Sequence, residues 1–142
     1  MSVLSADGQK ILIQQLFQDE GYKKFPYKDT LGFTTIGIGR NLDAQGISLD
    51  EAYYLLTNDV IKVEENLYKI FPFMQHLSDN RKMVLINMGF NIGMERLSRF
   101  VGMIHALSKG DYERAALEMS ESVWAKQVGA RATRLVQMMK DG

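Results

Sequence analysis

The chain contains no cysteine among its 142 residues. This absence excludes disulfide frameworks, thiolate metal sites and thiol nucleophiles, although a cysteine-free protein can work inside or outside the cytoplasm. No window approaches the roughly 18 consecutive apolar residues of a membrane-spanning helix. The first ten residues carry Asp7 and Gly8 where a secretory signal would have a basic start and an apolar run. We therefore expect neither an export signal nor a transmembrane segment.

An excess of charge of one sign is also lacking, because 17 basic and 17 acidic residues cancel. Without a net positive field, nothing draws the chain to nucleic acid, and we expect no nucleic-acid partner. Apolar residues make up 46% of the sequence and charged residues 24%, which is typical of soluble globular proteins. A chain of this length can bury its own core, so we expect one domain over residues 1–142. We also expect the protein to be a monomer.

The first half of the sequence predicts a helix, a small hairpin and a long helix. Apolar residues recur at helical spacing over residues 5–19, with Ser5 or Asp7 as the cap and Gly21 as the end. Residues 22–38 are rich in aromatic, β-branched and glycine residues around the polar turn 29–32, which predicts a β-hairpin.

A capping box opens the next helix, because Ser48 is followed three residues later by Glu51. The apolar stripe that follows predicts a long helix over residues 49–70, stopped by Pro72. Glycines at 93, 110 and 129 separate the remaining helical patterns. Further helices are predicted over residues 79–91, 97–107, 112–120 and 130–140.

The order of these elements indicates the fold class. The strands precede most of the helices and do not alternate with them, so we predict an α+β fold with a small sheet lobe and a larger helical lobe. The sheet lobe is expected over residues 21–47 and a connecting helix over 48–71. Residues 1–20 and 72–142 are expected to form the helical lobe.

Two carboxylates flank the first strand of the predicted hairpin. Glu20 stands at the end of the first helix, and Asp29 follows it by nine positions, near the hairpin turn. Cleavage of a glycosidic bond usually needs such a pair, with one protonated acid to assist the leaving oxygen and one carboxylate to direct a water or to attack. By spacing alone the pair is weak evidence, because most acidic residues are solvated surface groups.

The surrounding residues form a much longer pattern. Glu20-Gly21, Tyr27-Lys28-Asp29-Thr30 and Gly32-Phe33-Thr34-Thr35-Ile36-Gly37-Ile38-Gly39 follow one another in the order Glu, eight residues, Asp, five residues, Thr. This segment closely resembles the active-site segment of the phage-type lysozyme (muramidase) family. The similarity continues through residues 46–52, 86–93 and 122–127 and spans about residues 16–135. It implies a lysozyme-like fold in which the sugar chain lies between the two lobes.

The resemblance also implies roles for individual residues. Glu20 would be the general acid, Asp29 the base that directs a water, and Thr35 a hydroxyl that helps to hold that water. The family inverts at the anomeric carbon. Arg131 matches an arginine that lies beside the catalytic glutamate of the family. A cation there would lower the pKa of the glutamate, whereas a general acid needs a raised pKa. We therefore expect Arg131 to orient Glu20.

Substrate contacts are implied at five further positions. Asn41 and Phe90 fall on sugar-contacting positions of the family, and Met103 and Glu118 do so with a change of residue type. Asn91 is the fifth candidate. Two departures stand out: Arg40 occupies a position where the family usually has histidine, and residues 41–47 are a short connection to the long helix. Any ion pair made by residue 40 must therefore differ from the one that a histidine would make. The sheet lobe should be smaller than in longer members of the family.

The predicted function is an endo-acting peptidoglycan hydrolase that cuts between N-acetylmuramic acid and N-acetylglucosamine. It needs no cofactor or metal. As an endolysin it would accumulate in the host bacterial cytoplasm and reach the wall through a holin-like membrane helper. Two alternatives stay open. One is a lytic transglycosylase, which needs only the acid, and the other is a non-catalytic peptidoglycan-binding module of a phage particle.

Two other features have ordinary structural interpretations. Trp124 could stack on a sugar ring, but a single tryptophan is more often a core residue. The nine methionines are expected to fill gaps in the helical core.

Overall fold

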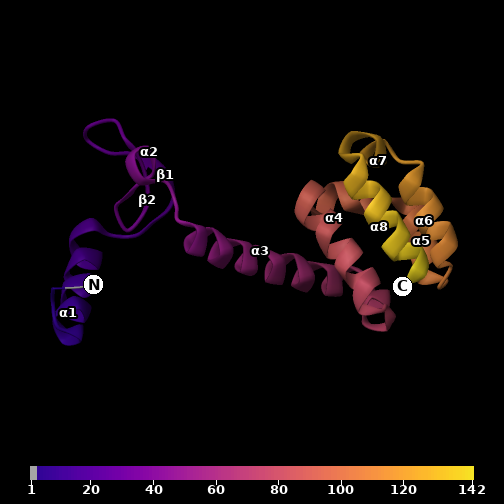
Figure 1. The fold of residues 1–142 in the computed structure, drawn as a ribbon, viewed down its shortest axis with the longest axis horizontal. Coiled ribbons are helices and arrows are strands. Elements are labelled where there is room, and N and C mark those ends of the chain that lie inside the picture. The colour runs from indigo at the N-terminus through magenta and orange to yellow at the C-terminus, as the bar shows by residue number, and fades with distance from the viewer. Residues whose placement is uncertain (1–2) are drawn as a thin grey trace. The chain divides into compact units, whose positions relative to one another are not determined.

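The computed structural model describes residues 3–142 (Figure 1). The chain divides into two compact units, Met1–Tyr53 and Tyr54–Gly142. The boundary between the units falls inside helix α3 (Leu49–Ile70). The grouping of residues 1–20 with the helical lobe remains a prediction.

The first unit begins with helix α1 (Ala6–Glu20). The Ser5 hydroxyl oxygen accepts a hydrogen bond from the Gly8 N–H at 3.0 Å, which satisfies one of the open donors of the first turn. At the other end the Gly21 N–H donates to the Phe17 carbonyl at 2.9 Å. The predicted cap and end of this helix are confirmed, and Glu20 is its last residue.

A three-stranded antiparallel sheet follows in the order β1-β2-β3. Strand β1 (Lys23–Lys28) pairs with β2 (Thr34–Gly37), as the hairpin prediction required. Strand β3 (Arg40–Asn41) and the short helix α2 (Leu42–Gln45) were not predicted. A two-residue strand has no periodicity to detect, and this one forms because its backbone pairs with β2.

Helix α3 begins at the predicted capping box. The Glu51 N–H donates to the Ser48 hydroxyl at 3.1 Å, and the Ser48 N–H donates to the Glu51 carboxylate at 2.8 Å. The helix ends before Pro72, and its bounds match the prediction. An unpredicted 3₁₀ helix, η1 (Pro72–His76), leads to the remaining helices.

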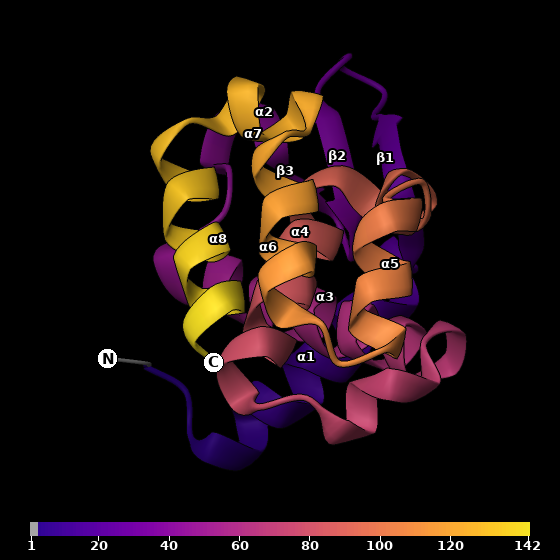
Figure 2. The same cartoon turned by 90° about the vertical axis from the view of Figure 1, so that its right-hand side faces the viewer.

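Five α-helices complete the second unit. Helix α6 (Tyr112–Ser120) lies between α5 (Val101–Ser108) and α8 (Ala130–Asp141) (Figure 2). The predicted helices at 112–120 and 130–140 are confirmed to within one residue. The helix predicted at 97–107 begins later, at Val101, and helix α7 (Val123–Val128) was not predicted. These helices are α4 (Asp79–Ser98), α5 (Val101–Ser108), α6 (Tyr112–Ser120), α7 (Val123–Val128) and α8 (Ala130–Asp141).

Helix α4 extends past its predicted end at residue 91. Gly93 has φ 83° and ψ 161°, so the chain kinks there and the helix then resumes as far as Ser98. Because glycine has no Cβ, it adopts this backbone conformation at little steric cost. The sequence signal for a break at Gly93 was therefore correct, but the break is a kink and the next helix begins later, at Val101.

The hydrophobic core of the second unit lies around α4. Five of the eight methionines within residues 3–142 are buried in it, as expected of gap fillers in this core. A Cβ added to Gly89 would lie 2.9 Å from a Val63 methyl, so α3 and α4 approach closely at this point. The fully buried side chains include Leu67, Met74, Val84, Leu85, Met88, Leu97, Met103, Met119, Leu135 and Met139.

The fold is α+β, with a small antiparallel sheet in the first unit and a helical second unit, as the order of elements predicted. Across residues 3–142, none of the helices combines the length and the apolar character needed to cross a membrane. The same residues contain no group of three histidine or acidic side chains placed to hold a metal ion.

Candidate active site

Glu20 lies against the turn that joins β2 and β3. A Cβ added to Gly39 would be 3.0 Å from Glu20 Oε2 and 3.1 Å from its carboxyl carbon. Gly39 also has φ 75°, a conformation that side chains with a Cβ rarely adopt. Glycine is therefore required at position 39 for two reasons, the close approach of Glu20 and the positive φ. Its backbone forms one wall of the space around the Glu20 carboxyl group.

Asp29 lies in the turn between β1 and β2. Its Oδ1 accepts hydrogen bonds from the Leu31 and Phe33 N–H groups, both at 2.9 Å. Within residues 3–142, no hydrogen bond occupies Oδ2. One oxygen thus fixes the carboxylate to the turn, and the other is available for a water or a substrate group.

Thr35 is the one polar residue that is buried among residues 3–142, with 4% of its surface exposed. Its hydroxyl donates to the Phe33 carbonyl at 3.1 Å, which leaves its oxygen able to accept. Phe33 therefore bonds to both candidates, because its N–H donates to Asp29 and its carbonyl accepts from Thr35. The sheet brings these two side chains to neighbouring places on the hairpin.

Asn41 pairs with Thr35 across β2 and β3. Its side-chain oxygen accepts from the Ala44 N–H at 3.0 Å and caps helix α2. The amide oxygen is therefore used by the fold, and only the amide nitrogen could donate to a sugar. Asn41 combines a structural role with the predicted binding role.

Arg40 forms an ion pair with Glu51, near the start of α3. Its guanidinium donates to both carboxylate oxygens of Glu51, with Nη1 to Oε1 at 2.9 Å, and Nη1 also donates to the Gly46 carbonyl at 3.0 Å. The hydrogen bonds from Arg40, and then those from Ser48, lower the pKa of Glu51 from 4.5 to about 2. The same pairing raises the pKa of Arg40.

The lowered pKa of Glu51 predicts how acid affects this pair. A depressed carboxyl pKa contributes stability that is present above pH 4.5 and is lost as pH falls towards about 2. We expect Glu51→Gln to lower the unfolding temperature at neutral pH, and the difference from wild type to shrink as the pH approaches 2. Thermal unfolding followed by circular dichroism at several pH values measures this. A difference that stays constant across the range would contradict it.

A cavity of about 700 Å³ in the second unit contains two of the predicted substrate-binding residues, Met103 and Glu118. Arg114 fixes Glu118 through Nε at 3.0 Å and Nη2 at 2.7 Å. The Glu118 carboxyl group also packs on Gly102, where a Cβ would lie 2.6 Å from it. Other residues of the lining include Ile92, Arg96, Arg99, Phe100, Trp124 and Gln127.

Phe90 and Asn91 lie outside the lining of this cavity. Asn91 contacts the lining through Trp124, because its side-chain oxygen accepts a hydrogen bond from Trp124 Nε1 at 2.9 Å. Trp124 is 4% exposed and meets Phe100 edge to face at 6.3 Å, so it is mainly a core residue, as expected. The predicted substrate-binding residues of the second unit therefore do not all line this cavity.

Arg131, in α8, is held by Asn87 of α4. Its Nε and Nη2 donate to the Asn87 side-chain oxygen at 2.9 and 2.6 Å. This pairing fixes the guanidinium plane and leaves other donors of the group for a second partner. The orientation of Glu20 by Arg131 remains a prediction.

Three features of the first unit were not predicted as parts of the site. They are the contact of Gly39 with Glu20, the pairing of Arg40 with Glu51, and a hydrogen bond from the Thr34 N–H to Asp43 at 2.7 Å. The glycine at position 39 is the one sequence signal that could have indicated the first feature. The Thr34–Asp43 and Arg40–Glu51 contacts join residues nine and eleven positions apart, and both depend on the region of β3, a strand that is too short to predict.

The model of the phage lysozyme family matches residues 18–140, which include all the candidate residues described above. The chain belongs to the phage lysozyme family.

Individual relatives are found in a phage and in a slime mould. The chain is 29% identical to "Probable T4-type lysozyme 2" of Dictyostelium discoideum, over 92% of this chain and 94% of that protein. "Probable T4-type lysozyme 1" of the same organism is 28% identical, over 87% and 90%. The "Pre-baseplate central spike protein Gp5" of Enterobacteria phage T4 is 27% identical over 92% of this chain, which spans only 28% of the spike protein's length.

Proposed function

We propose that this protein is a peptidoglycan hydrolase that cuts the β-1,4 bond between N-acetylmuramic acid and N-acetylglucosamine. Membership of the phage lysozyme family supports a lysozyme-type glycoside hydrolase. The observation that supports the catalytic residues is their arrangement in the first unit. Glu20 packs on the Gly39 backbone, and Asp29 and Thr35 share Phe33 as a hydrogen-bonding partner.

The proposed reaction uses the two carboxyl groups in opposite protonation states. Glu20 donates its proton to the glycosidic oxygen as the bond from that oxygen to the anomeric carbon breaks. A water attacks the same carbon from the other face and gives its proton to Asp29. The Oδ2 of Asp29 and the Thr35 hydroxyl would hold this water, because Oδ1 of Asp29 is already bound to the turn.

Substrate binding is proposed to use residues of both units. Asn41 would donate from its amide nitrogen, and Phe90 and Asn91 would contact sugar. Met103 and Glu118 would contact substrate through the cavity that they line. Arg131, held by Asn87, would orient Glu20.

The biological role is proposed to be that of an endolysin. The protein would stay in the host bacterial cytoplasm, as a monomer, until a holin-like helper opens the membrane, and would then act on the wall. The similarity to a T4 spike protein favours a second candidate, a peptidoglycan-binding module of a phage particle. The Glu20, Asp29 and Thr35 set favours turnover, because binding alone needs neither an acid nor a positioned water.

The reaction products test the proposal directly. Direct attack by water should invert the anomeric centre, so the β-linked substrate should first give an α reducing end. We expect proton NMR of a digest of purified glycan strands to show this α anomer before mutarotation mixes the two forms.

Each other product would identify a different activity. A β product would make Asp29 a nucleophile, which requires the two carboxyl groups to be about 5–5.5 Å apart instead of about 6.5–9.5 Å. Anhydro-sugars found by mass spectrometry would indicate a lytic transglycosylase. Binding to the strands without release of any product would indicate the particle module.

A further inference from the structure

Arg40 stands between two residues that touch the proposed catalytic groups. The preceding residue is Gly39, whose backbone lies against the Glu20 carboxyl group. The following residue is Asn41, which pairs with Thr35 across the sheet. A shift of the backbone at Arg40 would therefore move one wall of the Glu20 site and the strand beside Thr35 together.

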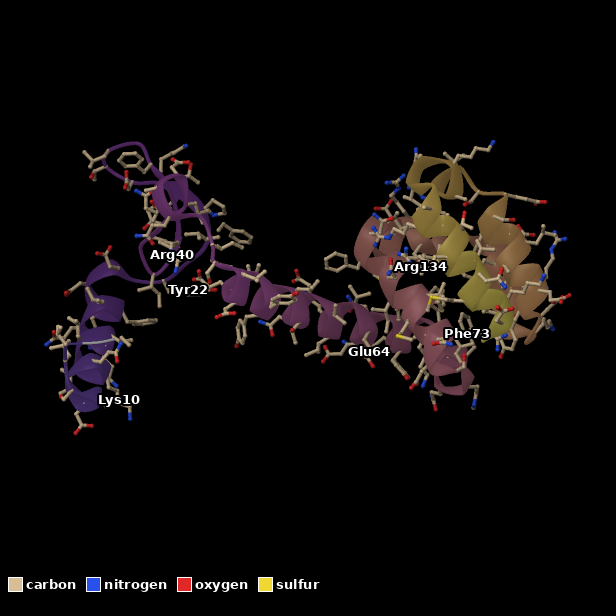
Figure 3. The ribbon with its side chains drawn as sticks, viewed as in Figure 1. Lys10, Tyr22, Arg40, Glu64, Phe73 and Arg134 are labelled. Atoms are coloured by element: carbon tan, nitrogen blue, oxygen red, sulfur yellow. The ribbon has the colours of Figure 1, made fainter. Side chains whose placement is uncertain are left out.

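The side chain of Arg40 fastens this strand to the start of α3. It donates to the Glu51 carboxylate through two nitrogens and to the Gly46 carbonyl. Glu51 is itself fixed, because it accepts from the Ser48 N–H at 2.8 Å in the capping box. We call this set of contacts, made by Arg40, Gly46, Ser48 and Glu51, the Arg40 clamp; Arg40 is labelled in Figure 3.

The geometry of the clamp explains why arginine suits this position. A planar guanidinium can bind a carboxylate through two parallel hydrogen bonds and still reach a third acceptor, whereas a lysine ammonium is a single point of charge. The Arg40 and Glu51 side chains are 33% and 41% exposed. Solvent screens a pair this exposed and limits what it adds to stability, and the same contacts also fix the position of the strand.

We propose that Arg40 is a positioning residue for Glu20, because the Arg40 clamp holds the Gly39 backbone against the Glu20 carboxyl group. This inference rests on the proposed function, in which Glu20 donates the proton. Proton transfer depends steeply on geometry, and a displacement of about 1 Å can cost about 10²-fold in rate. None of the four clamp residues is itself a predicted substrate-binding residue, so loss of the clamp should act mainly on the chemical step.

The test compares two variants of Arg40 on a soluble glycan fragment of alternating N-acetylglucosamine and N-acetylmuramic acid. Arg40→Met keeps the aliphatic stem but removes every donor, and we expect kcat to fall about 10-fold with KM changed less than about 2-fold. Arg40→Lys keeps the charge and should recover part of kcat. Lys10→Met, which removes an exposed positive charge from α1 (Figure 3), is the matched control and should keep the wild-type kcat.

Two further measurements separate positioning from a general loss of stability. Rates are taken at a temperature at which circular dichroism shows each variant to be fully folded. The double variant Arg40→Met with Glu51→Gln should have the same kcat as Arg40→Met alone, because the two residues act as one unit. Additive losses in the double variant would overturn the proposal.

Other outcomes distinguish this inference from the proposed function. If Glu20→Gln is inactive while folded Arg40→Met keeps the wild-type kcat, or raises only KM, the positioning role is wrong and the proposed function stands. If Glu20→Gln itself keeps the wild-type rate, the proposed function fails and the inference fails with it.

Discussion

Glu20→Gln is expected to abolish clearing of bacterial cell walls while the fold stays intact. Glutamine has nearly the same shape as glutamate, so it should still pack on the Gly39 backbone. The space there is too narrow for a Cβ, which would lie 3.0 Å from Glu20 Oε2. It cannot donate the proton that the leaving sugar oxygen needs. The loss of general acid catalysis should reduce the rate by at least ~10²-fold. Turbidity of permeabilised cells measures the rate, and circular dichroism checks the fold.

The matched control for this change is Glu64→Gln. Glu64 is an exposed residue of α3 (Figure 3), so this variant makes the same chemical substitution at a residue that is not one of the candidate site residues, and it should clear walls normally. If folded Glu20→Gln clears walls within a factor of a few of the wild-type rate, Glu20 is not the general acid.

Asp29→Asn is expected to cause the second large loss. The asparagine side-chain oxygen can still accept from the Leu31 and Phe33 N–H groups, so the hairpin turn should be retained. The amide that replaces Oδ2 cannot take a proton from water. We expect a loss of ~10²-fold or more in the hydrolysis rate, and a smaller but measurable loss for Thr35→Ala, which removes only a hydroxyl that holds the water.

Asp43→Asn is a close control because Asp43 also accepts a backbone hydrogen bond on this hairpin. Its Oδ2 accepts from the Thr34 N–H at 2.7 Å, and asparagine can keep that contact through its oxygen. The two variants thus make the same change in two carboxylates that both support the turn. Near-wild-type activity of Asp43→Asn beside inactive Asp29→Asn would assign chemistry to Asp29. Equal activity would instead indicate a transglycosylase or a binding module.

The longer elements could be predicted because their signals are local. The Ser48 and Glu51 capping box and Pro72 marked both ends of α3, and the apolar spacing and flanking glycines marked α6 and α8. Ser5 and Gly21 similarly bounded α1, which placed Glu20 at a helix end. Each of these signals acts within one or two helical turns, so a single sequence is enough to detect it.

The candidate site residues were found by a different kind of signal. The spacing of Glu20, Asp29 and Thr35 within a string of glycines and aromatics resembled a family pattern, and the family match covers the same residues. The pattern named these residues but not their contacts. Phe33, which bonds to both Asp29 and Thr35 through its backbone, has no side-chain signature that would indicate this role.

By itself, the sequence determined the α+β class, most helix ends and the identity of the candidate residues, because capping, periodicity and glycine or proline breaks depend on neighbours along the chain. Only the tertiary structure decided that Gly39 lies against Glu20, that Asp43 holds Thr34, and that Arg40 pairs with Glu51. Those contacts depend on the pairing of β2 with β3, which joins residues by backbone hydrogen bonds that any side chain permits. Their geometry therefore exists only once the sheet has formed.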